Sequence, residues 1–214
     1  MNIVPIVVTY VDHMGDDLRI ANVARVSFDK WSESLSERDT KLISYLAEHN
    51  HYTTFTHCVV SLRIKAPIFV ARQLVKHQVG LTWNEVSRRY VSSEPEFYMP
   101  DVWRSKPEGN IKQGSGAAHP ETGVLTKLTE DFVKSSLMMY QSMIEKGFAP
   151  EQARMILPLN TMTEWVWTGS LAAFARVCNL RLDPHAQAET ADVAQAISVV
   201  IAPLFPVAWK ELVG

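Results

Sequence analysis

Hydrophobic and polar residues alternate most regularly over residues 57–65. Every second position is apolar and the positions between are more polar, which predicts a half-buried β-strand. The apolar face consists of Cys58, Val60, Leu62 and Ile64. Residues 3–11 are short and rich in β-branched residues, which predicts another strand, and Pro5 favours the edge of a sheet.

The rest of the chain has mainly helical spacing. Ser36 followed by Asp39 resembles a capping box, which predicts a helix that begins there and ends near His49. Apolar spacing and flanking Pro or Gly residues predict further helices over 15–25, 67–79, 124–146, 150–157, 170–179 and 184–204. No repeat and no shift in composition divides the chain. We therefore expect one α+β domain over residues 1–214.

Residues 104–123 are polar and rich in Gly and Pro, and they form the one long predicted loop. A loop of this length is usually either functional or mobile. The alternative is a simple surface excursion.

Composition narrows the function classes. The chain has 214 residues, 47% of them hydrophobic, and a formal net charge of −2. This charge gives no general reason to expect nucleic acid or an anionic membrane as a partner, and no apolar stretch reaches the roughly 20 residues of a transmembrane helix. Cys58 and Cys178 both have apolar neighbours, which favours packing roles and a reducing cytoplasm.

Polar residues are densest over residues 73–90. This composition is also typical of a solvated loop. However, the segment follows a well-formed strand and helix, and it combines cations suited to phosphates with amides and a carboxylate suited to sugar hydroxyls and base edges.

Three further polar sets have two interpretations each. Arg154 interrupts an apolar run, so it either keeps its charge in water or meets a phosphate. Arg181 closes a predicted helix, a position that favours cations whatever their function, and His185 follows it. His49, His51 and His57 suggest a metal, but they lack regular ligand spacing, so we expect no metal site.

Together these motifs resemble the flavin-dependent thymidylate synthases, also called the ThyX class. That family has an Arg-His-Arg triplet followed by a serine within Asn-Glu-x-Ser-x-Arg-Tyr. Here the corresponding residues are Lys76-His77-Gln78 and, after eight intervening residues, Ser87 within the intact motif of residues 84–90. Further matching segments are 24–29, 51–57, 66–73, 153–160 and 179–187.

The resemblance implies a mostly antiparallel twisted sheet flanked by helices, and a reaction that methylates dUMP to dTMP. It implies FAD as cofactor, with NADPH and methylenetetrahydrofolate as co-substrates, and a homotetramer whose active sites lie between subunits. Arg181 and Ser87 correspond to residues at the reacting base, and we expect Ser87 to position the substrate. The residues implied to hold dUMP are Gln73, Lys76, Glu85, Ser87, Arg89, Arg154 and Arg181.

The same resemblance implies a set of flavin-side residues. They are Ser27, His51, Thr53, Lys76, His77, Gln78, Glu85, Ser170, Arg176 and His185. Lys76 and Gln78 replace both triplet arginines, and Ser170 and Arg176 stand where relatives often have asparagines. We expect weaker flavin binding unless Arg176, Arg88 or Arg72 replaces the lost charge, and tighter binding after Gln78→Arg.

Three other functions stay open from the residues alone. The same chemistry could act on UMP, since no residue decides the choice of sugar. A nucleotide-binding homologue without catalysis is a second alternative. A metal-dependent nucleotide hydrolase built on the histidines, Asp183 and His185 is a third. A thymidylate synthase of the other, flavin-free class would need a reactive thiolate, and both cysteines are expected to be buried instead.

Overall fold

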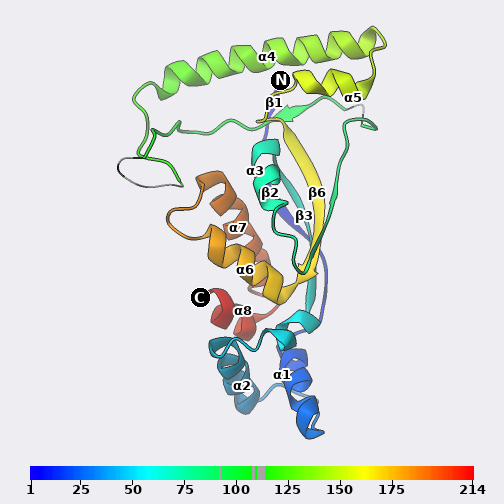
Figure 1. Ribbon diagram of the computed structural model, residues 1–214, viewed down its shortest axis with the longest axis vertical. Helices are drawn as coiled ribbons and strands as arrows, with labels where there is room; N and C mark the ends of the chain where they lie inside the picture. The colour runs from blue at the N-terminus through cyan, green and yellow to red at the C-terminus, as the bar shows by residue number, and fades with distance from the viewer. Residues whose placement is uncertain (92, 108, 110–113) are drawn as a thin grey trace.

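A four-stranded antiparallel sheet forms the centre of the molecule, in the order β2-β3-β6-β4 (Figure 1). The computed structural model describes residues 1–91, 93–107, 109 and 114–214. The strands of the central sheet are β2 (Val7–Met14), β3 (Val59–Pro67), β4 (Leu81–Glu85) and β6 (Met162–Ser170). A small parallel pair is formed by β1 (Asn2–Ile3) and β5 (Glu96–Phe97). The predicted α+β class with a mostly antiparallel sheet is confirmed.

Helices cover one face of the sheet and both of its ends (Figure 1). The helices α3, α6 and α7 lie beside the sheet, α4 and α5 cross one end, and α1, α2 and α8 lie at the other. Their bounds are α1 (Asp17–Arg25), α2 (Glu37–Glu48), α3 (Ile68–Leu74), α4 (Thr122–Glu145), α5 (Pro150–Ala153), α6 (Leu171–Arg181), α7 (Ala188–Ile201) and α8 (Pro206–Val213). Short 3₁₀ turns are η1 (Val26–Phe28), η2 (Tyr52–His57) and η3 (Arg154–Ile156).

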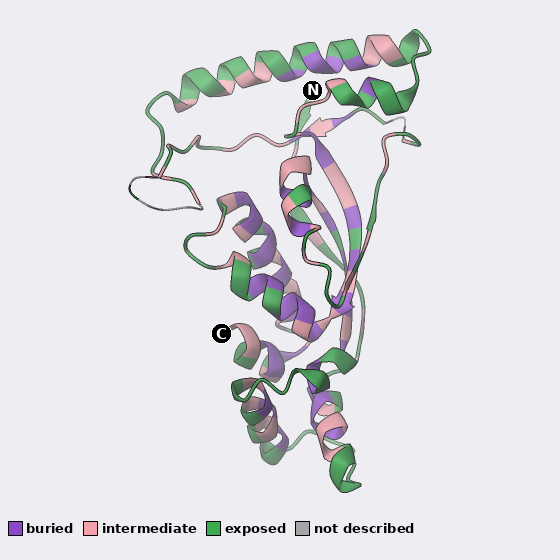
Figure 2. Ribbon diagram, in the orientation of Figure 1, coloured by how far each residue is buried: buried purple, intermediate pink, exposed green. Residues whose placement is uncertain are grey.

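The core lies between the sheet and the helices beside it (Figure 2). The apolar face predicted for β3 is confirmed, because Cys58, Val60, Leu62 and Ile64 are all fully buried. Trp165 and Trp167 on β6 are also core residues, at 1% exposure each. Full burial of one large apolar side chain stabilises the fold by roughly 1.5–3 kcal/mol. The alternate residues of β3 and β6 point to the opposite face, where Arg63 and Val166 remain exposed.

The predicted capping box at the start of α2 is present. The Ser36 side chain accepts a hydrogen bond from the Asp39 backbone N–H, and the Asp39 carboxylate accepts one from the Ser36 backbone N–H. Arg25 at the end of α1 contacts Asp39 Oδ1 at 2.7 Å. The fully buried Asp39 therefore joins α1 to α2.

The prediction of one continuous strand over residues 3–11 is wrong, because two separate strands occupy this segment. The chain pairs first with β5 and then, from Val7, with β3. Pro5 lies between the two strands, where its missing N–H costs no ladder hydrogen bond. A register shift between Tyr10 and Asp12 bends β2, which extends to Met14.

Two predicted helices are too long. The helix predicted to reach Gly80 ends at Leu74, and Gly80 then adopts a positive φ of 75° before β4. The helix predicted over 184–204 begins at Ala188, since Asp183 Oδ1 accepts from the His185 backbone N–H in a local turn. It ends at Ile201, and Ala202 follows as a C-cap that still has helical geometry, because Pro203 has no backbone N–H to continue the helical hydrogen bonds. The strands β4, β5 and β6 and the helix α8 were not predicted.

The described parts of the predicted loop 104–123 are paired with each other. The Ser105 backbone N–H donates to the Ala117 carbonyl at 2.8 Å, and the His119 N–H donates to the Trp103 carbonyl at 2.7 Å. Arg104 also forms an ion pair with Glu189 on α7. Residues 108 and 110–113 lie outside the described residues, so mobility of the loop remains a prediction. Among the described residues, none of the helices has the length and apolar character needed to span a membrane.

Candidate functional site

The end of α3 is joined to the α6–α7 corner by two side-chain hydrogen bonds. Gln73 Oε1 accepts from the Thr190 hydroxyl at 2.6 Å, and His77 Nε2 accepts from Arg181 Nε at 3.0 Å. The prediction that Gln73 and His77 share a helix face is wrong, because α3 ends at Leu74 and His77 lies beyond it. Both side chains nevertheless contact the α6–α7 corner. We call Gln73, His77, Arg181 and Thr190 the α3–α7 group.

The electrostatics of this group favour a neutral imidazole beside a charged guanidinium. Burial lowers the pKa of His77, and the neighbouring Arg181 and Arg176 charges lower it further. Burial also lowers the pKa of Arg181. A neutral His77 keeps a lone pair for Arg181, which fixes the direction of the guanidinium. The group can therefore hold a positive charge near a bound ring or anion.

A cavity of about 720 Å³ adjoins the segment between α3 and β4. It is lined by Val79 and Gly80 from that segment and by Ser170 and Arg176 from β6 and α6. Arg176 donates a hydrogen bond to the Val79 carbonyl. Among the described residues that line this cavity, Arg176 is the one arginine or lysine. We call it the Arg176 cavity.

The Arg176 cavity combines groups that suit part of a flavin nucleotide with one carboxylate, Glu211, which disfavours a phosphate beside it. Its cation suits a phosphate, Asn50 and Thr56 offer polar groups, and Ala172, Ala173 and Ala175 give a smooth apolar wall. The predicted residues Ser170 and Arg176 are thus in the lining, while the exposed Lys76 and Gln78 belong to the same segment as Val79.

A second set of predicted residues gathers at the other end of β4. Glu85 accepts hydrogen bonds from the Thr163 hydroxyl at 2.7 Å and from Trp83 Nε1 at 3.2 Å. Glu85 and Arg154 line one cavity of about 370 Å³. Three other cations line this cavity and each has a partner: Arg63 pairs with Glu164, Lys65 pairs with Glu96, and Arg88 donates to the Ser93 and Glu94 carbonyls. Arg154 is thereby the better candidate for a phosphate. We call this the Arg154 cavity.

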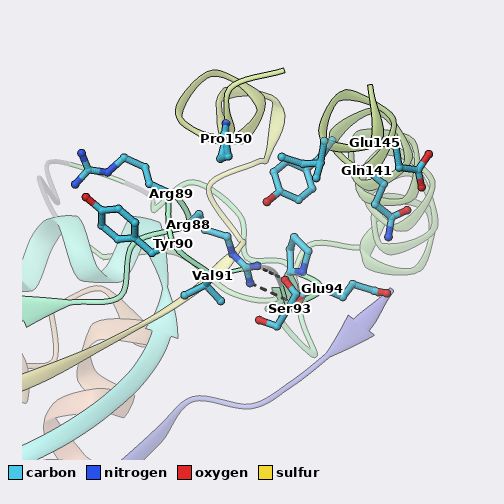
Figure 3. A pocket seen from close by; sticks show the side chains of 12 residues that line it. Arg88, Arg89, Tyr90, Val91, Ser93, Glu94, Gln141, Glu145 and Pro150 are labelled. Atoms are coloured by element: carbon cyan, nitrogen blue, oxygen red, sulfur yellow. Dashed lines mark hydrogen bonds between the residues drawn. The ribbon is translucent and has the colours of Figure 1, made fainter. Parts of the chain in front are cut away.

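The motif serine lies next to the Arg154 cavity. Ser87 Oγ accepts from Arg89 Nε at 3.1 Å, and the Arg89 guanidinium lies 5.0 Å from the centre of the Tyr90 ring. Figure 3 shows Arg88, Arg89 and Tyr90 around a neighbouring cavity of about 340 Å³ below Pro150. Arg88 donates to the carbonyls of Ser93 and Glu94 there, so its charge is directed away from the Arg176 cavity.

The predicted nucleotide residues therefore fall into two groups within one chain. The strand β4 runs from Leu81 to Glu85, and four steps of about 3.3 Å separate its two ends by roughly 13 Å. Leu81 pairs with Gly169 and Glu85 with Trp165, at different points along β6. The α3–α7 group and the Arg154 cavity share no lining residue among those described.

Four other predicted flavin-side residues are more scattered. Ser27 lies exposed in η1, and His51 precedes η2, whose Thr53 is also exposed. His185 hydrogen bonds to Asp183 in the turn before α7. None of these four lines the Arg176 cavity within the described structure.

The histidine cluster does not form a metal site in the structure. His49 stacks on Tyr45 with 4.0 Å between ring centres, and its Nδ1 lies 2.9 Å from the Tyr45 carbonyl oxygen. Within the ranges that the structure describes, no three His, Cys, Asp or Glu residues are arranged to hold a metal ion. The metal-dependent hydrolase therefore lacks a ligand set there.

Sequence reasoning missed three residues that touch the predicted site. Thr190 contacts Gln73, and Trp83 and Thr163 contact Glu85. Thr163 and Thr190 are distant in sequence from their partners, so only packing brings them together. Trp83 was detectable, because Leu81, Trp83 and Glu85 alternate with Thr82 and Asn84 as in a strand.

The structure is an α+β fold in which each of the two candidate cavities has an arginine that suits a phosphate-bearing ligand. Residues 9–207 match the family model described as thymidylate synthase complementing protein. A flavin-dependent thymidylate synthase of Thermus thermophilus is 38% identical over 202 residues, which cover 94% of this chain and 73% of the relative. That of Thermosipho africanus is 38% identical over 192 residues, covering 88% and 82%.

A solved structure is also similar over nearly the whole chain. The UMP/dUMP methylase PolB from Streptomyces cacaoi, bound with 5-Br dUMP, is 27% identical and covers 98% of this chain and 95% of its own, with a TM-score of 0.87. The chain belongs to the thymidylate synthase complementing protein family, together with the flavin-dependent thymidylate synthases. The resemblance inferred from the motifs is confirmed.

Proposed function

We propose that this protein is a flavin-dependent thymidylate synthase that converts dUMP to dTMP. The observation that carries the proposal is the family match across residues 9–207 in a chain whose thiols are both inaccessible. Burial raises the pKa of Cys58 and of Cys178 to about 12, so neither supplies a thiolate near neutral pH. Activation of the uracil ring must then come from other groups.

The reaction is a reductive methylation. The methylene group of methylenetetrahydrofolate replaces the proton at C5 of uracil, one hydride completes the methyl group, and the products are dTMP and tetrahydrofolate. A bound flavin, proposed to be FAD, supplies this hydride after taking electrons from NADPH. The flavin cofactor is supported by the names of the relatives, while FAD, NADPH and the folate are our proposals.

Arg181 is proposed as the catalytic residue at the base. Its guanidinium is half-buried and held by His77, so it can stabilise negative charge that develops on the uracil ring. Arg154 is proposed to hold the nucleotide phosphate. The other proposed nucleotide contacts are Gln73, Lys76, Glu85, Ser87 and Arg89, and Ser87 has a positioning role because Arg89 is its only described side-chain partner.

The flavin is proposed to occupy the Arg176 cavity and the segment beside it. Ser170 and Arg176 line the cavity, and Lys76, His77 and Gln78 precede it in the chain. The remaining proposed flavin contacts are Ser27, His51, Thr53, Glu85 and His185.

A homotetramer with active sites between subunits would join the two groups of nucleotide residues. Two exposed surfaces support this proposal. Within the described structure no helix covers the sheet face opposite the core, and much of α4 is exposed (Figure 2), including apolar residues along its length. The exposed apolar residues of α4 are Val124, Leu125, Leu128, Phe132, Met138, Met139 and Ile144. We also propose that residues 1–214 act as one domain; a cytoplasmic location remains a prediction from the cysteines.

One experiment tests class and substrate together. Purified protein receives NADPH, methylenetetrahydrofolate and either dUMP or UMP under anaerobic conditions, with and without FAD, and nucleotides are read by mass spectrometry. We expect dTMP only when FAD is present. Binding of dUMP without turnover would instead support a homologue that has lost catalysis.

UMP is the second candidate substrate. The structurally similar PolB is described as a UMP/dUMP methylase. Its structure with 5-Br UMP matches this chain with a TM-score of 0.85. A methylated product from UMP in the same assay would support this broader specificity.

The shared active site has its own test. Arg154→Ala and Arg181→Ala are each expected to be inactive alone. If one site combines Arg154 from one subunit with Arg181 from another, mixing and reassembling the two variants restores part of the activity. No recovery in mixed tetramers, verified by mass spectrometry, would contradict shared sites.

A further inference from the structure

The buried hydroxyl of Thr190 determines how the Gln73 side chain can act. Thr190 is fully buried in the first turn of α7, and it donates to Gln73 Oε1 at 2.6 Å. This is the one hydrogen bond of the Thr190 hydroxyl within the described structure. The Gln73 amide nitrogen has no protein partner among the same residues.

A glutamine amide can usually turn over and exchange its donor and acceptor ends. Here the hydroxyl proton of Thr190 requires an acceptor, so the amide oxygen faces α7 and the NH₂ group faces away. Gln73 is half-buried in the last turn of α3, so part of its side chain remains accessible. The result is an oriented donor with no protein acceptor.

We propose that Thr190 is a positioning residue for nucleotide binding, because it turns the Gln73 amide so that its NH₂ group meets an acceptor oxygen of the uracil nucleotide. The proposal rests on the proposed function, since Gln73 is taken as a nucleotide contact. In this proposal the site beside Gln73 binds a hydrogen-bond acceptor of the nucleotide, a carbonyl or phosphate oxygen, and disfavours a hydrogen-bond donor there.

The arrangement around Gln73 supports an oriented site. His77, one turn further along the chain, is held by Arg181 in the same way that Gln73 is held by Thr190. Glu189, next to Thr190, is fixed by its ion pair with Arg104. Each polar side chain of the α3–α7 group that can turn is therefore held by a partner from α6 or α7.

The test measures dUMP binding by isothermal titration calorimetry, which does not depend on turnover. Thr190→Val keeps the shape and removes the hydroxyl, and Thr190→Ser restores a hydroxyl at the same position. A single hydrogen bond of ordinary strength biases the amide orientation by roughly fivefold. Losing this bias lowers the fraction of Gln73 amides that point the NH₂ group at the nucleotide from roughly five in six to about one half. We therefore expect Thr190→Val to raise the Kd for dUMP about twofold and Thr190→Ser to leave the Kd unchanged.

Two further variants separate positioning from general stability. Ser198→Ala removes another hydroxyl of α7, which accepts from Trp209 Nε1 at 2.8 Å away from Gln73. It should lower the melting temperature and leave the Kd unchanged. Gln73→Leu removes the donor itself and should weaken binding at least as much as Thr190→Val.

The outcomes distinguish this inference from the proposed function. If Gln73→Leu weakens dUMP binding while Thr190→Val does not, Gln73 acts without Thr190 and the inference is wrong. An unchanged Kd in both variants also overturns it. If the unmodified protein does not bind dUMP at all, the proposed function itself fails.

Discussion

Whether Arg176 supplies the positive charge of the proposed flavin site can be tested by removing this arginine and by introducing another at position 78. Gln78 is neutral, and the Arg176 guanidinium lines the adjoining cavity and is tethered to the Val79 carbonyl. Of the three arginines that could replace the lost triplet charge, Arg88 is bonded to the Ser93 and Glu94 carbonyls in another cavity. Arg72 lies exposed on α3 and does not line the Arg176 cavity. Arg176 is therefore the candidate.

The expected size of the effect follows from one charged hydrogen bond. Such a bond contributes about 1.5–3 kcal/mol, or roughly 10–150-fold in Kd. Arg176 is exposed, so solvent and salt reduce its contribution to the low end of that range. We expect Arg176→Gln to weaken FAD binding about tenfold and Gln78→Arg to tighten it by several-fold. The double variant should return close to the original affinity.

The assay is titration of oxidised FAD with purified protein, followed by flavin fluorescence at low and high salt. The difference between Arg176→Gln and the unmodified protein should shrink as salt rises, because the lost contact is ionic. Arg72→Gln is the matched control, with the same change of side chain on α3, and should leave the Kd unchanged. Equal FAD affinity in Arg176→Gln and the unmodified protein would refute the reasoning.

Three further predictions follow from buried groups. Replacing Cys58 and Cys178 together by Ser should leave dTMP formation largely intact, since the pKa of each thiol is about 12. Complete loss of activity in a variant with unchanged circular dichroism would contradict the thiol-independent mechanism. Asp39→Asn should lower the free energy of unfolding by about 1–3 kcal/mol in urea, because it removes a capping carboxylate and the partner of Arg25; an unchanged urea midpoint would contradict this. Since the pKa of Asp39 lies below 3.8, its contribution should persist above that pH and fade as the pH falls through the folded-state value. The pKa of His77 lies below its ordinary value of 6.5, so the unfolded chain binds the proton first and stability falls as the pH drops below 6.5. His77→Gln should show a smaller fall over that interval in pH-dependent thermal unfolding, and an identical pH profile would exclude His77 as the source.

Regular local patterns predicted two parts of the fold in which one face is buried, but they did not predict β6, whose Trp165 and Trp167 are also buried. The alternation along β3 and the Ser36–Asp39 capping box both appear in the structure as expected. The strand β4 was missed for a physical reason: it is an edge strand whose exposed residues are polar, so its composition is like that of a loop. Only the spacing of Leu81 and Trp83 marked it as a strand.

The candidate site shows where sequence reasoning ends. Motif matching identified Gln73, His77 and Arg181, but not which of them touch. The bond between His77 and Arg181 spans 104 positions and that between Gln73 and Thr190 spans 117, so both depend on how α3 packs against the α6–α7 corner. Thr190 has no local signature, since a threonine in the first turn of a helix is ordinary.

The division of the nucleotide residues has a consequence for stability and catalysis together. The strand β4 (Leu81–Glu85) is paired with β6 over its whole length, so Glu85 at its end cannot move toward the α3–α7 group without breaking that ladder. Shortening the roughly 13 Å between the two ends of β4 within one chain would cost several backbone hydrogen bonds. Bringing a second chain against the open face of the sheet costs none of them, and it also covers exposed apolar surface. The rigid β4–β6 pair is therefore an argument for the proposed site between subunits.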